Sequence, residues 1–249
     1  MKKSTGIFRF KRFDVINERS AMKVNTDGVL LGALMTIEPS DRCLLDIGTG
    51  TGTIALMAAQ RLSECAESMQ RVRIDAIDID EPSATEAAGN FRNSPWGNCL
   101  CAHHASLDEF IASKPESEFD LVFSNPPYFD NALNAPEQRR NAARHTATGL
   151  SYREILDFAA EHLTSTGRVA MVLPADTEHD LTRHARMSGL HLYKITRIRT
   201  VPRKAPSRIV AEFSRQLTTS PADTILTIQD GGQYTQEYLD LMHEFYLFA

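Results

Sequence analysis

The sequence LLDIGTGTG at residues 44–52 decides the fold. The apolar run at residues 43–47 predicts a short strand, and residues 53–62 carry apolar side chains at helical spacing. Between them, the glycines allow a ligand to approach the backbone closely and leave the first N–H groups of the helix unpaired. The stretch therefore predicts a strand, a ligand-binding turn and a helix in succession.

Strands and helices alternate along the rest of the chain. Strands are predicted at residues 72–79, 98–102, 119–123, 168–173, 190–201, 208–216 and 224–229, and helices at residues 27–35, 82–91, 151–163, 175–187 and 235–248. Thr26 is the predicted N-cap of the first helix. Repeated strand–helix units favour a parallel sheet with helices on both faces. We therefore expect an α/β fold with a doubly wound, mostly parallel seven-stranded sheet and an antiparallel C-terminal strand.

An acidic residue precedes the glycine turn and distinguishes it from a dinucleotide site. Dinucleotide-binding turns have the pattern G-x-G-x-x-G, whereas this one is D-x-G-x-G-x-G, and Asp46 would repel a pyrophosphate. A carboxylate there suits a ligand that carries an ammonium group. Asp78, at the tip of the second strand, can accept two hydrogen bonds from a ribose diol, and Ile79 can cover an adenine ring. A plain tight turn with solvated acids is the alternative.

The tetrapeptide Asn125-Pro126-Pro127-Tyr128 follows the strand at residues 119–123. The carboxyl ends of parallel strands form the edge where open α/β sheets bind ligands. Two prolines stiffen the turn and remove N–H donors, which leaves carbonyls, one amide and a phenol ring. The side-chain oxygen of Asn125 and the carbonyl of Pro126 could each accept one N–H of a planar substrate's amino group. Tyr128 could stack on the substrate's ring.

Together these motifs resemble the class I S-adenosylmethionine-dependent methyltransferases, whose Rossmann-like fold is the one expected above. The resemblance implies that Asp46 and Gly48 lie near the methionine end of the cofactor and that Gly50 lets the backbone pass it. It implies that Asp78 holds the ribose and that Ser106, after the third strand, contacts the adenine. The predicted cofactor site also includes Thr49, Gly52 and Ile79.

The tetrapeptide resembles that of the amino-group methyltransferases, which act on adenine N6, guanine N2 or a glutamine amide. The lead-in MKVNTDGVLLGA at residues 22–33 resembles the bacterial tRNA(Val) adenine-N6 methyltransferase family, which modifies the purine beside the anticodon. The resemblance implies that Lys23, Thr26 and Asp27 lie near the methionine end of the cofactor, although an ordinary capped helix is the alternative. The likeness continues at residues 143–145, 201–208 and 232–247.

We therefore predict methylation of the exocyclic N6 of an unpaired adenine in tRNA, a base that flips out more easily than one in a duplex. Methylation of a glutamine N5 in a translation factor is one alternative, but that class carries, by resemblance, a separate helical N-terminal domain. Only about 40 residues precede the glycine turn here. Guanine-N2 methylation of rRNA is a second alternative. A non-enzymatic module that chaperones RNA is a third, and the intact tetrapeptide disfavours it.

Charge is distributed unevenly along the chain. The net charge of −5, from 27 basic and 32 acidic side chains, argues by itself against a nucleic-acid partner. Residues 1–24 carry +5 and residues 183–208 carry +8, however, which leaves −18 on the remainder. Two basic segments fit phosphate contacts on one face, and Phe8, Phe10 and Phe13 suit stacking on RNA, although solvated surface is the alternative. The predicted RNA contacts are Arg9, Lys11, Arg12, Arg140, Arg144, His145, Arg199, Arg203, Lys204 and Arg208.

Length and composition describe an ordinary globular protein. The chain has 249 residues, 42% of them hydrophobic and 24% charged, which is enough for a large core. We expect a basic N-terminal arm at residues 1–24 and a methyltransferase domain at residues 25–249. The longest strongly apolar run, residues 29–37, is far shorter than the roughly 20 residues that span a bilayer. The basic N-terminus has no apolar run after it and is not a signal peptide.

The cysteines and histidines predict no metal centre. The four cysteines, at positions 43, 65, 99 and 101, contain no C-x-x-C pair. Cys99, Cys101 and His103 share one face of a predicted strand, but a closed zinc site needs four ligands. We expect a monomer in the reducing cytoplasm, with tRNA as its partner, S-adenosylmethionine as its cofactor, no metal and no membrane contact.

Overall fold

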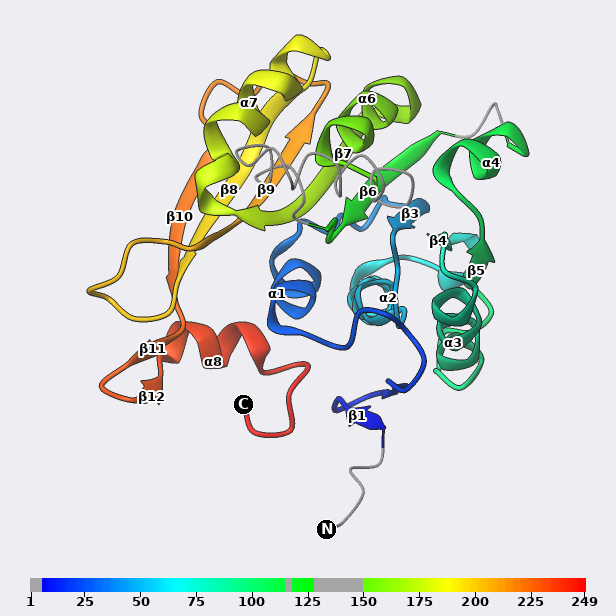
Figure 1. Ribbon diagram of the computed structural model, residues 1–249, viewed down its shortest axis with the longest axis horizontal. Helices are drawn as coiled ribbons and strands as arrows, with labels where there is room; N and C mark the ends of the chain where they lie inside the picture. Colours follow the sequence, from blue (N-terminus) through cyan, green and yellow to red (C-terminus); the bar gives the residue numbers. More distant parts are fainter. Residues whose placement is uncertain (1–5, 115–117, 128–149) are drawn as a thin grey trace, which may run out of the picture.

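The computed structural model describes residues 6–114, 118–127 and 150–249. Its centre is an eight-stranded sheet in the order β10-β8-β9-β7-β6-β3-β4-β5 (Figure 1). Neighbouring strands run parallel, except that β9 is antiparallel to both β7 and β8. The strands are β3 (Cys43–Ile47), β4 (Arg73–Asp78), β5 (Leu100–His104), β6 (Phe119–Ser124), β7 (Leu163–Pro174), β8 (His191–Arg199), β9 (Arg208–Ser214) and β10 (Ala222–Thr227).

Helices cover both faces of this sheet (Figure 1). Successive residues of a strand point to opposite faces, so Leu44 packs in one buried apolar cluster and Leu45 in the other. The doubly wound α/β fold predicted from the sequence is therefore confirmed. One cluster includes residues of α1 (Thr26–Leu34), α2 (Thr53–Cys65), α3 (Glu81–Arg92) and α8 (Gln236–Met242), and the other includes residues of α4 (Leu107–Ala112), α6 (Tyr152–His162) and α7 (Glu178–Met187).

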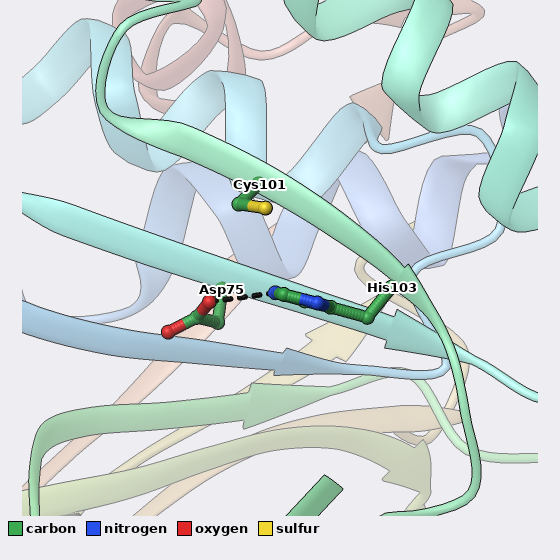
Figure 2. A group of neighbouring side chains, drawn as sticks. All are labelled: Asp75, Cys101 and His103. Carbon is green, nitrogen blue, oxygen red and sulfur yellow. Dashed lines mark hydrogen bonds and ion pairs between the residues drawn. The ribbon is translucent and has the colours of Figure 1, made fainter. Parts of the chain in front are cut away.

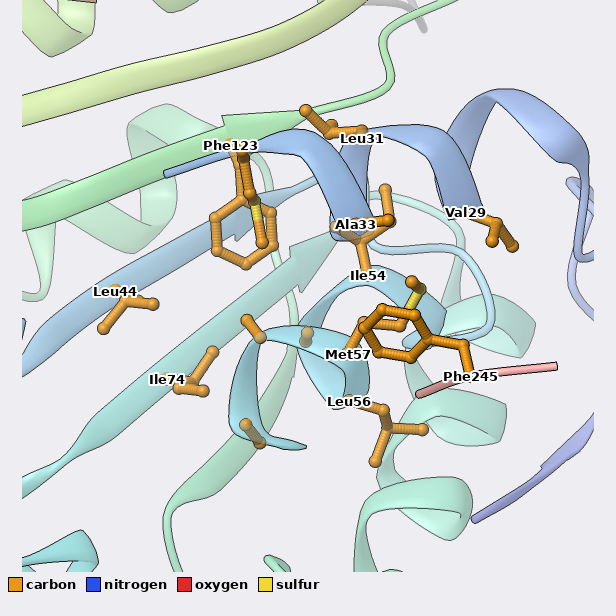
Figure 3. Packing of buried hydrophobic residues seen from close by; sticks show 14 of the residues in the cluster. Val29, Leu31, Ala33, Leu44, Ile54, Leu56, Met57, Ile74, Phe123 and Phe245 are labelled. Carbon is orange, nitrogen blue, oxygen red and sulfur yellow. The ribbon is translucent and has the colours of Figure 1, made fainter. Parts of the chain in front are cut away.

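The packing of α1 and α2 on the sheet fixes the helix that follows the glycine turn. Leu31 of α1, Met57 of α2 and Phe123 of β6 are fully buried in the same cluster (Figure 3). Burying a side chain of this size contributes about 1.5–3 kcal/mol. The helix that follows the glycine turn thus belongs to one apolar cluster with Leu44 of β3 and Phe123 of β6, the two strands that carry the predicted motifs.

The sheet has one strand more than the seven expected. Each of the eight predicted strand ranges corresponds to one of its strands, and the strand predicted at residues 224–229 is β10, which pairs in parallel with β8 at the edge. The expected antiparallel strand is β9, which precedes β10. Short elements that were not predicted include the helix α4, a hairpin of β11 (Gln229–Asp230) and β12 (Gln233–Tyr234), and the N-terminal hairpin described below.

The cap of the first helix and the end of the last helix differ from the prediction. Asn25, and not Thr26, caps α1, because the Asn25 side chain accepts the N–H of Gly28 over 2.9 Å and Thr26 is already helical. The last helix ends at Met242 instead of residue 248. Among the described residues, no helix has both the length and the apolar character to cross a bilayer.

The N-terminal segment packs on the body of the protein from residue 6 onward. β1 (Ile7–Arg9) and β2 (Asp14–Ile16) form an antiparallel hairpin. Phe10 and Phe13 are only 3% and 5% exposed, and their stacked rings lie 4.5 Å apart in the apolar cluster of α1 and α2. Stacking of these two rings on RNA, as predicted, is therefore wrong. Phe8 is partly buried, with its ring 4.8 Å from that of Phe10.

Candidate active site

The glycine turn joins β3 to α2 at the carboxyl edge of the sheet. Gly48 and Gly50 have φ angles of +72° and +57°, which other residues rarely adopt. A Cβ atom at Gly48 would meet no other atom within 4 Å, so the backbone there faces open space. The N–H groups of Gly48 and Thr49 donate to the carbonyl of Ile77 over 2.9 and 3.0 Å. The turn is thus held against the end of β4 with the backbone of Gly48 exposed.

Asp78 ends β4 and is hydrogen-bonded to the turn. Its Oδ2 accepts the N–H of Gly50 over 2.8 Å, and its Oδ1 accepts the N–H of Asp80 over 2.9 Å. Burial raises the pKa of this carboxyl, although the two hydrogen bonds oppose the shift. The next side chain, Ile79, is 53% exposed. The carboxylate of Asp78, the apolar side chain of Ile79 and the backbone of the glycine turn therefore meet at one edge of the sheet.

A pocket of about 470 Å³ opens beside the turn. This volume lies in the range of pockets that enclose small ligands. The predicted site residues that line it are Gly48, Gly50, Asp78, Ile79, Ser106, Asn125, Pro126 and Pro127. Lining residues that the sequence analysis did not single out include Met22, Asp80, Ser83, Asp108 and Glu154. Met22 begins the lead-in stretch and Asp80 follows Asp78 closely, whereas no local pattern marks the other three.

Asp46 lies behind the turn and does not line the pocket. Its side chain is fully buried, and Oδ2 accepts a hydrogen bond from Thr49 Oγ1 over 2.7 Å. Within the described part of the chain, Oδ1 is buried and has no hydrogen-bond partner. Burial raises the pKa of Asp46 to about 7, and the charge of Asp78 adds to this while the hydrogen bond from Thr49 opposes it. A donor that reached Oδ1 would remove the cost of this unpaired acceptor.

The raised pKa of Asp46 predicts how stability changes with pH. The folded chain holds this proton more tightly than the unfolded chain, so the free energy of unfolding falls as the pH rises from 3.8 to about 7. The full loss is at most about 4 kcal/mol. Asp46→Asn keeps an acceptor for Thr49 and removes the titration. The free energy of unfolding in urea is measured without ligand for both proteins. Between about pH 5 and about pH 8, the wild type should lose stability relative to the variant. If the difference in free energy between the two proteins is the same at both pH values, the raised pKa of Asp46 is contradicted.

The tetrapeptide begins where β6 ends. Ser124 Oγ donates to the carbonyl of Ile47 over 2.7 Å, which ties the end of β6 to the end of β3. Asn125 is 7% exposed, and its Nδ2 lies 3.5 Å from the sulfur of Met22. Pro126 and Pro127 line the pocket, and Tyr128 lies outside the described residues. The Asn125 amide is therefore held at the pocket beside the glycine turn.

Several residues predicted for the cofactor do not line the pocket. Lys23 and Thr26 lie just before and at the start of α1, and Asp27 forms an ion pair with Arg208 over 2.9 Å. A Cβ atom at Gly52 would lie 2.5 Å from the ring of Phe91, so this glycine allows α2 and α3 to pack. These four residues therefore do not line the pocket.

Ser106 lines the pocket, but its polar groups are engaged elsewhere. Its N–H and its hydroxyl both donate to Glu109 Oε2 over 2.9 Å, and the hydroxyl also accepts the N–H of Glu109. This capping box starts α4. The exposed Asp108 lies two residues further on in the same lining, with a carboxylate that can accept hydrogen bonds.

The N-terminal basic side chains make contacts within the chain. Arg9 lies 4.0 Å from Asp14, and Lys11 Nζ donates to the carbonyl of Ala249 over 2.9 Å. Arg12 pairs with Glu64 over 2.6 Å and lies over the ring of Trp96. These three predicted RNA contacts are therefore held by intramolecular partners.

The second basic segment is partly engaged as well. Arg199 donates to Thr227 Oγ1 over 2.8 Å, whereas Arg203 and Lys204 are exposed in the loop between β8 and β9. A hollow of about 680 Å³ beside α7 is lined by Arg183 and Arg186, among other residues of that helix. The remaining predicted contacts, Arg140, Arg144 and His145, lie outside the described residues.

Three possible metal ligands approach one another on β4 and β5 (Figure 2). Donor atoms of Asp75, Cys101 and His103 lie within 4.8 Å of each other. Asp75, however, already accepts His103 over 2.7 Å, Lys114 over 3.1 Å and Arg73 over 2.5 Å. Burial raises the pKa of Asp75, but these three hydrogen bonds outweigh it and hold the pKa below its ordinary value. Two neighbouring cations would repel a metal ion, so the group acts as a charge network.

Comparison with solved structures identifies the same fold. A predicted O-methyltransferase from Agrobacterium tumefaciens superposes with a TM-score of 0.64, covering 88% of this chain and 96% of the other at 16% identity. At this identity the likeness shows the fold alone.

Comparison of sequences goes further. The family model of the methyltransferase small domain matches residues 20–187. A protein of Flavobacterium johnsoniae named tRNA1(Val) (adenine(37)-N6)-methyltransferase is 40% identical, over 97% of this chain and 99% of its own length. One of the same name from Flavobacterium psychrophilum is 38% identical, with the same coverage. The chain therefore belongs to the methyltransferase small-domain family and, within it, to the family of the tRNA1(Val) (adenine(37)-N6)-methyltransferases.

Proposed function

We propose that this protein transfers a methyl group from S-adenosylmethionine to the exocyclic N6 of an unpaired adenine in tRNA. The target would be the purine beside the anticodon of tRNA(Val), at position 37, as the names of the relatives state for those proteins. One observation carries the proposal: Asn125 and the two prolines line the same pocket as the glycine turn and Asp78. The four free cysteines, Cys43, Cys65, Cys99 and Cys101, are compatible with the proposed cytoplasmic setting.

The residues of the pocket fit S-adenosylmethionine, which supplies an electrophilic methyl group when it is bound. The open space at Gly48 and the backbone of Gly50 leave room for the methionine part. Asp46 lies behind the turn, so its unpaired Oδ1 would interact with the ammonium group of the ligand through a bridging donor. Asp78 would hold the ribose diol and Ile79 would cover the adenine. All of these residues come from one chain, which is compatible with a monomer.

The tetrapeptide would position the amine of the target base. The nitrogen of an exocyclic amine is a poor nucleophile because its lone pair is delocalised into the ring. The Asn125 side-chain oxygen and the Pro126 carbonyl would each accept one N–H, which favours tetrahedral geometry and directs the lone pair into the pocket. Asn125 is nearly buried, so these hydrogen bonds form in a site of low dielectric. The cationic product loses its proton readily, and the rate depends mainly on positioning.

The exposed basic loop between β8 and β9 predicts a salt-dependent contact with tRNA. Reversing both charges, with Arg203→Glu and Lys204→Glu, should weaken binding and reduce the slope of log affinity against log salt by about 1.4 to 1.8. The matched control is Arg71→Glu with Arg92→Glu, which reverses two exposed charges outside both basic segments. Filter binding at several salt concentrations measures the slopes. Identical slopes for wild type and the loop variant would remove this loop from the interface.

The class of methyl acceptor is tested by offering each alternative substrate to the same protein in a separate reaction. The purified protein is incubated with labelled S-adenosylmethionine and either total tRNA, rRNA or translation factors, and the products are identified by mass spectrometry. We expect N6-methyladenosine in tRNA. N2-methylguanosine in rRNA or methylated glutamine in protein would overturn the proposal in favour of the corresponding alternative.

A further inference from the structure

The segment of residues 18–22, called the strap below, is held by one buried carboxylate. Glu86, on α3, is 6% exposed. Its Oε2 accepts the N–H groups of Glu18 and Arg19 over 2.9 and 2.7 Å, and its Oε1 accepts the N–H of Ser20 over 3.1 Å. Hydrogen bonds to an ionised acceptor are about twice as strong as neutral ones. Consecutive backbone groups of the strap are therefore fixed to α3 by a single side chain.

Two further side chains of α3 support this attachment. Ser83 Oγ accepts the N–H of Ala21 over 3.3 Å. Asn90 accepts the N–H of Ile16 over 2.8 Å and donates to its carbonyl over 3.0 Å, immediately before the strap. Ser83, Glu86 and Asn90 are spaced by three and four residues, so they lie on one face of the helix. That face follows the strap along its length.

The other end of the strap reaches the proposed catalytic amide. Ala21 and Met22 line the pocket, and the sulfur of Met22 lies 3.5 Å from Nδ2 of Asn125. A Cβ atom at Gly50 would lie 3.4 Å from Ser20 Oγ and 3.5 Å from the carbonyl of Met22. The strap therefore lies between α3 and the pocket and contacts both the glycine turn and the tetrapeptide.

We propose that Glu86 is a positioning residue for methyl transfer, which it assists by holding the strap so that Met22 orients the Asn125 amide. Nδ2 is the donor that faces the sulfur, so the amide oxygen is the group that would accept an N–H of the substrate amine. A thioether is a weak acceptor, so the contact fixes direction more than it adds stability. Glu86 touches neither substrate nor cofactor and acts through the backbone of the strap. This inference rests on the proposed function of Asn125.

The fold has anchors on both sides of the strap that do not depend on Glu86. Phe13 and Val15 are buried upstream, and Val29 and Leu30 of α1 are buried downstream. Loss of the Glu86 carboxylate should therefore release the strap locally and leave the rest of the chain folded. The expected defect is misplacement of Asn125, and displacement by about 1 Å can lower a rate by up to about 100-fold.

Glu86→Gln tests the inference directly. The glutamine has one carbonyl acceptor, and its NH₂ group would face at least one N–H donor of the strap. We expect kcat per folded molecule to fall at least about tenfold, while the KM for S-adenosylmethionine changes by less than about threefold. The control is Glu81→Gln, which removes an exposed carboxylate from the same helix and should retain the wild-type kcat. Met22→Leu, which keeps the size and removes the sulfur, should lower kcat in the same way but less.

The measurements are made at a temperature where circular dichroism shows each variant folded. If Glu86 only stabilised the fold, Glu86→Gln would lower the melting temperature and leave kcat near the wild-type value; that result would overturn the inference. A rise of about tenfold in the KM for S-adenosylmethionine, with an unchanged kcat, would also overturn the inference. Methyl transfer by the wild type is measured first, because its absence would contradict the proposed function, whereas normal transfer by Glu86→Gln would contradict only the positioning role.

Discussion

Asn125→Ala should lose methyl transfer while it still binds S-adenosylmethionine. The alanine removes the side-chain oxygen that would accept an N–H of the target amine, and the side chains of the next two residues, both prolines, carry no acceptor that could replace it. Removing one preorganised hydrogen-bonding group from a catalytic site lowers kcat by about 100- to 1,000-fold. We therefore expect single-turnover rates to fall at least about 100-fold. Cofactor affinity, measured by calorimetry, should stay near that of the wild type.

The matched control for this variant is Asn98→Ala, which removes an exposed asparagine amide outside the pocket and should retain activity. Near-normal transfer by Asn125→Ala would show that the tetrapeptide does not position the amine. If the variant loses cofactor binding as well as activity, Asn125 maintains the structure of the pocket and does not position the substrate.

Asp78→Asn should lose affinity for S-adenosylmethionine. The change is nearly isosteric, but it replaces one acceptor oxygen with an NH₂ group that would face the ribose or the N–H of Gly50 or Asp80. A hydrogen bond to a charged group contributes about 1.5–3 kcal/mol, so we expect the Kd to rise about 10- to 150-fold. Calorimetric titration measures it.

Activity of Asp78→Asn at saturating cofactor separates binding from chemistry. We expect kcat to recover largely when the cofactor concentration is raised, because Asp78 would contact the ribose and not the reacting atoms. Asp240→Asn, which removes an exposed carboxylate on α8, should bind cofactor as the wild type does. An unchanged Kd for Asp78→Asn would place the cofactor elsewhere.

The sequence predicted the sheet well because its strands and helices have strong local periodicity. The apolar run at residues 43–47 predicted a strand, and the structure places the adjacent Leu44 and Leu45 in separate apolar clusters on the two faces of the sheet. The strand predicted at residues 224–229 is β10, whose bounds were less exact because most of its residues are exposed. The N-terminal hairpin was missed because strands of three residues are too short to show a period.

The parts of the site that depend on contiguous residues could be predicted, and those that depend on distant residues could not. The glycine turn, Asp78 and the tetrapeptide each form a short motif, and the structure brings them to one pocket. Glu86 contacts backbone groups 66 to 68 positions away in sequence, and nothing in its own neighbourhood marks it. Charges interleaved with phenylalanines suggested an RNA-binding arm, but the hairpin turns Phe10 and Phe13 into the core.

The central claim is that the pocket methylates the N6 amine of an unpaired adenine in tRNA. Its most direct test uses unmodified tRNA(Val) transcripts with either adenine or purine, which lacks the exocyclic amine, at position 37. Both are incubated with the wild-type protein and labelled S-adenosylmethionine, and the nucleosides are separated by mass spectrometry. We predict one N6-methyladenosine in the adenine transcript and no label in the purine transcript. Equal labelling of the two transcripts, or no labelling of the adenine transcript, would contradict the claim.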